Sequence, residues 1–84
     1  MPKAVRIYTK QVCPYCRRAK ELLKSKEVAF EEVDVSEDQA KRDELAAKTG
    51  MATVPLIFIG DQFVGGSDDL QELEDSGKLD GMLA

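Results

Sequence analysis

The sequence predicts an α/β fold in which a four-stranded mixed sheet is flanked by helices, in the order β-α-β-α-β-β-α. Strand-like and helix-like segments alternate in the first half, which requires parallel strands joined by helical crossovers. In the second half, two strand-like runs are separated only by Gly60-Asp61, which is typical of a hairpin. With 84 residues the chain is long enough for one core, so we expect a single domain over residues 1–84.

The first strand is expected at residues 4–9 and the second at residues 29–35, where apolar residues alternate with acids. The segment 14–27 between them follows helical spacing. Its inner face would carry Cys16, Ala19, Leu22, Leu23 and Lys26. Its solvated face would carry Arg17, Arg18, Lys20 and Glu21. Pro14 suits the first helical position, which needs no N–H partner, so Cys13 is expected to be the N-cap.

The remaining elements are predicted from caps and turns. A capping-box pattern at residues 36–39 predicts that a second helix begins there and ends near Gly50. Its apolar face is thin and consists of Ala40, Leu45, Ala46 and Ala47. Residues 54–59 form a buried-type strand, and residues 62–64 pair back against it. Gly65 and Gly66 then break the chain before a third helix at 68–75, with Ser67 as its N-cap and a final turn at 77–84.

Composition excludes several classes of function. The formal net charge of −4 argues against general nucleic-acid binding. No His is present, which excludes His-based metal sites and Cys–His nucleophile pairs. The longest apolar stretch, residues 54–59, is too short to cross a membrane, and the N-terminus has no signal-peptide pattern. We therefore expect a protein of the reducing cytoplasm, where a close cysteine pair is more often catalytic or metal-binding than structural.

The segment Cys13-Pro14-Tyr15-Cys16 contains the only two cysteines and can close into a small redox-active disulfide. At a helix N-cap, unpaired N–H groups and the positive end of the helix dipole favour the thiolate of Cys13. The nearby cations Lys10, Arg17 and Arg18 act in the same direction. Cys16 lies one turn further and should be more buried. We therefore expect Cys13 to attack a disulfide first and Cys16 to resolve the product.

Two other interpretations of the cysteine pair are weaker. A buried pair without function is unusual at an N-cap beside proline. A zinc site normally requires four ligands, which one copy of this chain does not have, although two copies could combine their pairs. No metal ligands are therefore assigned.

Two further segments have both a structural and a functional interpretation. A cis Val54–Pro55 bond would turn the Val54 backbone toward an extended peptide-like substrate, but the residues alone favour trans, since only about 5–6% of such bonds are cis. After Gly65-Gly66, the N–H groups of Ser67 and Asp68 form an anion site. The carboxylates of Asp68 and Asp69 could hold an ammonium group, so this corner suits the head of an α-amino acid. Taken alone, the corner is more simply a helix cap.

In this order and spacing, the three segments resemble the glutaredoxins over essentially the whole chain. The resemblance is carried by Tyr8-Thr9-Lys10 before Cys-Pro-Tyr-Cys, by Thr53-Val54-Pro55, and by Gly-Gly-Ser-Asp-Asp-Leu at residues 65–70. The chain is most similar to the bacterial dithiol class, the glutaredoxin 3-like proteins. The resemblance implies a thioredoxin fold, a cis Pro55, and glutathione as co-substrate without a tightly bound cofactor. Met51 and Leu56 depart from the family, in which polar residues are frequent at these positions.

The resemblance also implies the site residues. Cys13 would be the glutathionylated nucleophile and Cys16 its partner in the disulfide. The Val54 backbone would pair with the cysteinyl residue of glutathione. The other implied contacts are Thr53, Pro55 and Tyr15 beside that residue, Lys10 and Arg42 at the glycine carboxylate, and Gly66, Ser67, Asp68 and Asp69 at the γ-glutamyl head.

The implied activity is a glutathione-dependent reduction of protein disulfides and glutathione mixed disulfides by a monomeric enzyme. Ribonucleotide reductase, other reductases and glutathionylated proteins are all open as clients; no nucleic acid or membrane partner is expected. One rival is a related electron donor reduced by thioredoxin reductase. The other is a dimer that binds an iron–sulfur cluster through Cys13 and glutathione, although Pro14 stiffens the loop such a cluster would need.

Overall fold

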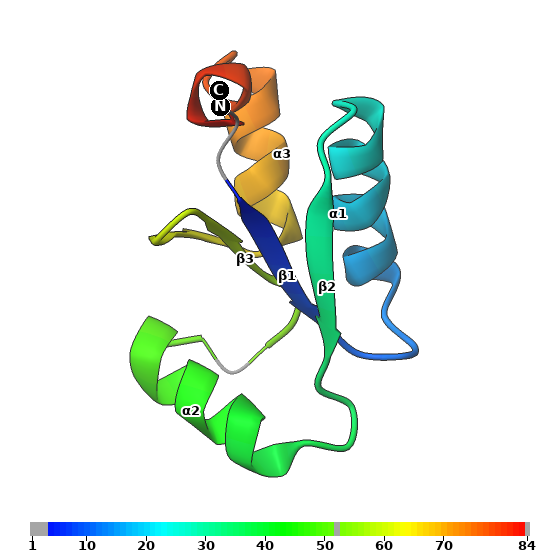
Figure 1. Cartoon of the computed structure of the whole chain (residues 1–84), viewed down its shortest axis with the longest axis vertical. Coiled ribbons are helices and arrows are strands. Elements are labelled where there is room, and N and C mark those ends of the chain that lie inside the picture. Colours follow the sequence, from blue (N-terminus) through cyan, green and yellow to red (C-terminus); the bar gives the residue numbers. More distant parts are fainter. Residues whose placement is uncertain (1–3, 52, 84) are drawn as a thin grey trace.

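The computed structural model describes residues 4–51 and 53–83. Residues 1–3, 52 and 84, which belong to the expected domain, lie outside this part. The elements are β1 (Val5–Thr9), α1 (Pro14–Ser25), β2 (Phe30–Asp34), α2 (Gln39–Thr49), β3 (Leu56–Ile59), β4 (Gln62–Gly65), α3 (Ser67–Asp75) and α4 (Leu79–Leu83). In the sheet order β2-β1-β3-β4, β1 is parallel to β2 and antiparallel to β3 (Figure 1). The predicted mixed four-stranded sheet is confirmed.

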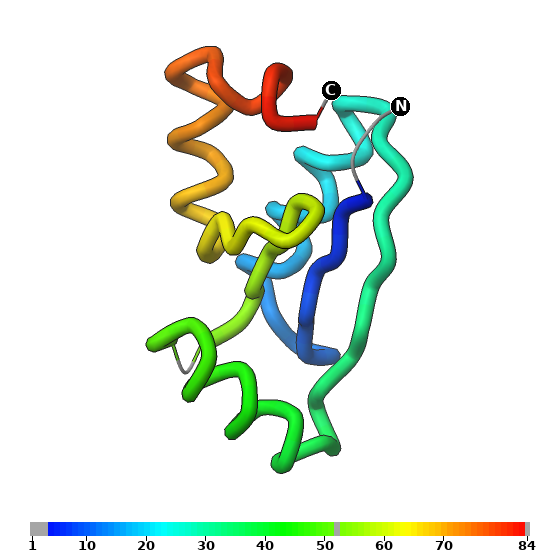
Figure 2. The backbone as a smooth tube through the Cα atoms, turned by 60° about the vertical axis from the view of Figure 1, so that its left-hand side comes forward, coloured from blue at the N-terminus to red at the C-terminus, as the bar shows by residue number. Residues whose placement is uncertain are grey.

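Helices cover both faces of the sheet because strand residues alternate between two apolar cores. In β1, Ile7 and Tyr8 point to opposite faces. The first core joins the sheet to α1, α3 and α4, and its buried members are Val5, Ile7, Ala19, Leu23, Ile57, Ile59, Leu70, Leu79 and Leu83. The second core lies under α2 and consists of Tyr8, Val35, Leu45, Leu56 and Phe58. In Figures 1 and 2, α2 and α4 lie at opposite ends of the molecule.

The capping-box prediction for the second helix is wrong by two residues. The N-cap of α2 is Asp38, whose carboxylate accepts the Lys41 N–H at 2.9 Å. The Ser36 hydroxyl instead accepts the Gln11 N–H at 2.8 Å, across the loop that precedes α1. Ser36 therefore links the loop before α2 to the loop before α1 and does not cap a helix. The helix does end at Gly50, as predicted.

The predicted cap of the third helix is also one residue late. Ser67 is the first residue of α3, and the N-cap is Gly66. The Gly66 N–H donates to the Asp69 carboxylate at 3.0 Å, so an acid of the first turn reaches back to the cap. This arrangement leaves the Ser67 hydroxyl without a capping role and half-exposed at the helix end.

Candidate functional site

Cys13 is the N-cap of α1, as predicted. Its backbone is extended, with φ −151° and ψ 101°, and Pro14 follows at the first helical position. The Cys16 N–H donates to the Cys13 sulfur at 3.2 Å. A sulfur anion in this place receives a backbone donor at the positive end of a helix, which stabilises it. Both cysteines are free thiols in this structure, so the described state is the dithiol.

Cys16 lies one turn further along α1 and is only 2% exposed. Burial raises the pKa of the Cys16 thiol to about 12, and the hydrogen bond with Cys13 adds to this effect. The Lys10 backbone N–H and the charge of Lys20 lower the pKa of Cys16, but burial outweighs both. At neutral pH Cys16 is therefore a protonated thiol, and it becomes a nucleophile only when its proton leaves.

The Val54–Pro55 segment lies beside the thiol of Cys13. The Cys13 S–H donates to the Val54 carbonyl at 3.9 Å. The peptide bond between Val54 and Pro55 is cis. The expectation from the residues alone, a trans bond, is therefore wrong, and the one implied by the family resemblance is confirmed.

A hollow of about 310 Å³ next to Cys13 collects most of the expected site residues. Three segments form it: the start of α1, the loop before β3 and the start of α3. Its lining consists of Tyr15, Met51, Thr53, Val54, Pro55, Gly66, Ser67, Asp68 and Asp69. All of these except Met51 were expected from the sequence to contact a ligand. The hollow has an acidic end at α3 and a backbone edge at Val54.

Lys10 and Arg42 do not line this hollow. Lys10 contributes to a second hollow of about 650 Å³, on the side of Cys13 that faces α1. The Arg42 guanidinium donates to the Ser36 carbonyl at 3.2 Å and to the Gln39 side chain at 2.6 Å. Arg42 is thus engaged at the start of its own helix.

The comparisons with known proteins agree with this geometry. The sequence model of the glutaredoxin family matches residues 5–64 of the chain. The chain belongs to the glutaredoxin family. It is 52% identical to Glutaredoxin 3 of Escherichia coli over 94% of this chain and 95% of that protein. It is also 52% identical to a glutaredoxin of Pseudomonas aeruginosa over 100% of this chain and 99% of that protein.

The fold agrees with this assignment. A crystal structure of a buckwheat glutaredoxin–glutathione complex matches with a TM-score of 0.90 and 32% identity, over 94% of this chain and 74% of that one. The fold is therefore the thioredoxin fold that glutaredoxins share. Glutaredoxins are glutathione-dependent thiol–disulfide oxidoreductases, and this is the activity of the chain.

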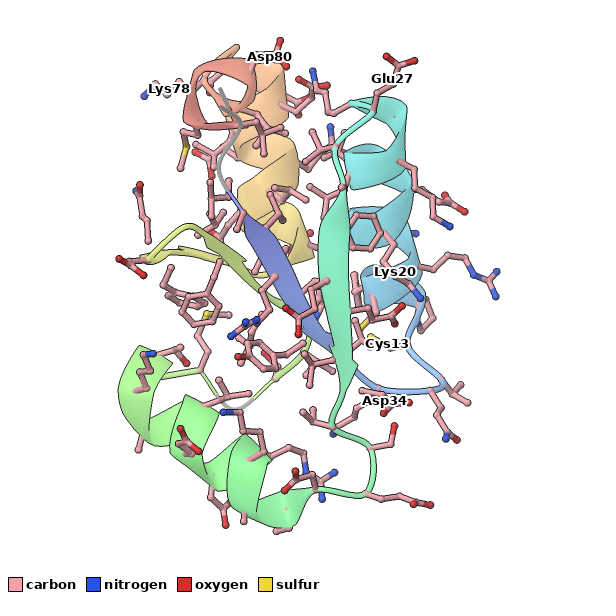
Figure 3. All side chains as sticks on the ribbon, viewed as in Figure 1. Cys13, Lys20, Glu27, Asp34, Lys78 and Asp80 are labelled. Atoms are coloured by element: carbon pink, nitrogen blue, oxygen red, sulfur yellow. The ribbon has the colours of Figure 1, made fainter. Side chains whose placement is uncertain are left out.

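Sequence reasoning missed one polar group at this glutaredoxin site. Lys20 was expected on the solvated face of its helix, but its side chain is 30% exposed and its ammonium group bonds Glu32 of β2 at 3.0 Å. In Figure 3, Cys13 lies at the lower end of α1 and Lys20 lies above it along the same helix. The spacing of four residues between Cys16 and Lys20 puts both on one side of a helix and could have revealed the pair.

Two kinds of feature were searched for in the described residues, a cluster of metal-ligating side chains and a membrane-spanning helix. Across residues 4–51 and 53–83, no three His, Cys, Asp or Glu side chains gather in a way that would hold a metal ion. In the same part of the chain, none of the helices is both long enough and apolar enough to span a lipid bilayer.

Proposed function

We propose that Cys13 is the nucleophile and Cys16 the resolving thiol of this glutaredoxin, which acts in the reducing cytoplasm with glutathione as its co-substrate. The hollow of about 310 Å³ beside Cys13 is the observation that carries this proposal. Its lining contains eight of the ten residues that the family resemblance assigns to glutathione. The unequal surroundings of the two thiols support the division of roles.

The reaction on a glutathione mixed disulfide needs only Cys13. Its thiolate attacks the glutathione sulfur, a Cys13–glutathione disulfide forms, and the client thiolate leaves and takes up a proton. The thiolate of a second glutathione attacks the same glutathione sulfur. Glutathione disulfide then departs, and Cys13 returns to its reduced state.

The reaction on a protein disulfide needs both cysteines. Cys13 attacks one client sulfur and releases the other as a thiolate. Cys16 then loses its proton and attacks the Cys13 sulfur, which forms the Cys13–Cys16 disulfide and frees the second client thiol. Two glutathione molecules restore the dithiol and leave as glutathione disulfide.

Glutathione would lie across the hollow with its γ-glutamyl head at α3. The N–H groups of Ser67 and Asp68 at the N-terminus of α3 would bind the α-carboxylate. The carboxylates of Asp68 and Asp69 would attract the ammonium group. The Val54 backbone would pair with the cysteinyl residue, between the side chains of Thr53 and Tyr15, and Gly66 and Pro55 would form the floor.

At the other end, the glycine carboxylate would meet Lys10, which lies near Cys13 on the α1 side. Arg42 would join Lys10 only by giving up its bond to the Gln39 side chain. Lys10 is therefore the main cation of this proposal and Arg42 a secondary one. We further propose that the enzyme acts as a monomer, with clients such as ribonucleotide reductase or glutathionylated proteins.

Two cysteine variants test the division of roles. Cys13→Ser should reduce turnover to the uncatalysed background with both a glutathionylated peptide and a protein disulfide. Cys16→Ser should keep activity on the glutathionylated peptide and lose it on the protein disulfide. Both rates are followed by NADPH oxidation through glutathione reductase, after circular dichroism has shown that the variants are folded.

The same assay excludes the rival electron donor. Thioredoxin reductase in place of glutathione and its reductase should support little turnover. If Cys13→Ser were as active as the unmodified enzyme, the assignment of the nucleophile would be wrong. If thioredoxin reductase sustained the faster turnover, glutathione would not be the physiological reductant.

A further inference from the structure

Hydrogen bonds link three polar side chains from β1, β2 and α1, namely Thr9, Glu32 and Lys20. The Thr9 hydroxyl, on a residue only 1% exposed, donates to a Glu32 carboxylate oxygen at 2.8 Å. The Lys20 ammonium group donates to the same oxygen at 3.0 Å. These two hydrogen bonds lower the pKa of the Glu32 carboxyl group, so it is ionised at neutral pH. The Lys20 charge is therefore held by a carboxylate that is itself fixed by a buried strand residue.

Lys20 is placed to act on Cys16. It follows Cys16 by one helical turn, and both residues line the hollow of about 650 Å³ that also exposes Cys13. The groups that shift the pKa of the Cys16 thiol are the Cys13 side chain, the Lys10 backbone N–H that follows β1 and the charge of Lys20. Lys20 in turn faces Glu32 and Asp34 of β2. Among the side chains that act on Cys16, Lys20 alone brings a positive charge.

We propose that Lys20, held in place by Glu32 and Thr9, is a positioning residue that stabilises the thiolate which Cys16 must form to resolve a client mixed disulfide. This inference rests on the proposed roles of Cys13 and Cys16. In the resolving step, the Cys16 proton passes to solvent and the Cys16 sulfur bonds to the Cys13 sulfur. The bond between Cys13 and the client breaks, and the client thiolate leaves and is protonated.

The charge of Lys20 should therefore affect the reduction of protein disulfides more than the reduction of glutathione mixed disulfides. Burial raises the pKa of a thiol, and a nearby fixed cation offsets part of that rise because it stabilises the thiolate. The step that uses Cys16 gains from the charge, whereas a reaction that uses Cys13 alone gains less. Lys20 would therefore favour protein disulfides over glutathione mixed disulfides as substrates.

A two-phase thiol reaction isolates the resolving step. When the reduced enzyme meets Ellman's reagent, attack by Cys13 releases one coloured thiolate, and attack by Cys16 on the resulting mixed disulfide releases the second. Stopped-flow absorbance gives both rate constants between pH 6 and pH 9. Their ratio reports on Cys16 and not on the overall folding of the site.

Lys20→Met should lower the ratio of second to first rate constant about threefold at neutral pH. Loss of this charge should reduce the Cys16 thiolate fraction, and the greater nucleophilicity of a more basic thiolate should recover only part of the lost rate. The pH profile of the second phase should move to higher pH. Lys20→Arg, which keeps the positive charge, should restore the ratio.

Lys24→Met is the matched control, because Lys24 is an exposed lysine one turn further along the same helix. It should leave the ratio unchanged. An unchanged ratio in Lys20→Met, or equal slowing of both phases, would overturn the inference. A second phase that persists in Cys16→Ser would instead contradict the proposed cysteine roles, so the two failures are distinguishable.

Discussion

At the scale of single residues, Cys13 and Cys16 differ in their exposure to solvent although they are only one helical turn apart. Cys13 is half-buried at the helix end, whereas Cys16 is 2% exposed against the sheet. The helix periodicity predicted this contrast, since position 16 shares a face with Ala19 and Leu23. The pattern did not predict that Lys20 would turn toward β2, because its Glu32 partner belongs to a strand twelve residues away.

The burial of Cys16 makes the stability of the reduced protein depend on pH. The pKa of the Cys16 thiol is raised from 9.0 to about 12 in the folded state, so the unfolded chain releases this proton first. The stabilising effect of the buried thiol is therefore complete below pH 9 and is lost as the pH rises toward 12. Between pH 9 and pH 10 the expected loss is about 1 kcal/mol in the free energy of unfolding.

A pair of variants isolates this effect from other ionisations. Urea unfolding at pH 8, 9 and 10 compares Cys13→Ser with Cys13→Ser/Cys16→Ser, neither of which can form the internal disulfide. Lysine and tyrosine ionisations are common to both, so they cancel in the difference between the two free energies. A difference that stays constant over this pH range would contradict the assignment of a high pKa to Cys16.

At the scale of elements, the start of α3 depends on a close contact between Gly65 and Asp69. Gly65 has φ +128°, a conformation that side chains other than glycine rarely adopt. A Cβ at this position would collide with the Asp69 carboxylate and lie 2.8 Å from the Asp69 Cβ. Asp69 is also the acceptor for the Gly66 N–H. The conformation at the end of β4 and the cap of α3 therefore depend on the same side chain, Asp69.

Gly65→Ala should therefore destabilise the protein by about 2–4 kcal/mol, from backbone strain and the loss of a cap bond. Gly66→Ala is the matched control, because Gly66 has φ −95° and its Cβ would meet nothing closer than the Pro55 carbonyl at 3.4 Å. We expect it to lose less than about 1 kcal/mol. Urea unfolding of both variants measures the difference, and equal losses would show that the Asp69 contact is unimportant.

Element order was predictable from the sequence, whereas helix starts were less so. Periodicity and turns alone predicted the hairpin at Gly60-Asp61 and the apolar face of α1. The start of α2 was not predictable, because it depends on whether the Ser36 hydroxyl bonds its own helix or the distant Gln11 N–H. Position along the chain does not reveal such a partner. The same limit applies to Arg42, whose partners at Ser36 and Gln39 are known only from the structure.

At the scale of the whole molecule, one lysine joins three helices. Lys26, the C-cap of α1, bonds Glu74 of α3 at 2.6 Å and Asp80 of α4 at 2.9 Å. These hydrogen bonds raise the pKa of the Lys26 ammonium group, so the charge persists throughout the neutral range. The sequence predicted that Lys26 lies on the inner face of its helix, and in the structure only 17% of its side chain is exposed.

Lys26→Met should lower the free energy of unfolding more than Arg6→Met does. Arg6 also forms an ion pair, with Glu31, but both side chains are more than half exposed, and such pairs contribute little. The Lys26 side chain is only 17% exposed and pairs with two carboxylates, of which the less exposed, Glu74, would lose its partner in Lys26→Met. Urea unfolding at low salt measures both losses. Because ions screen the exposed pair more strongly, 1 M salt should weaken the effect of Arg6→Met to a greater degree. A larger loss in Arg6→Met would contradict this ranking.

The Lys26→Met variant also tests whether the chain is a single domain, as we propose. The core under α2 and the core under α1, α3 and α4 share the same strands, so they should unfold together. Amide hydrogen exchange should then show the same loss of protection for the slowest protons of β1 and for Leu45 of α2, although Lys26 touches only the first core. If protection fell in the first core while Leu45 kept its original value, the two sides of the sheet would be separate cooperative units.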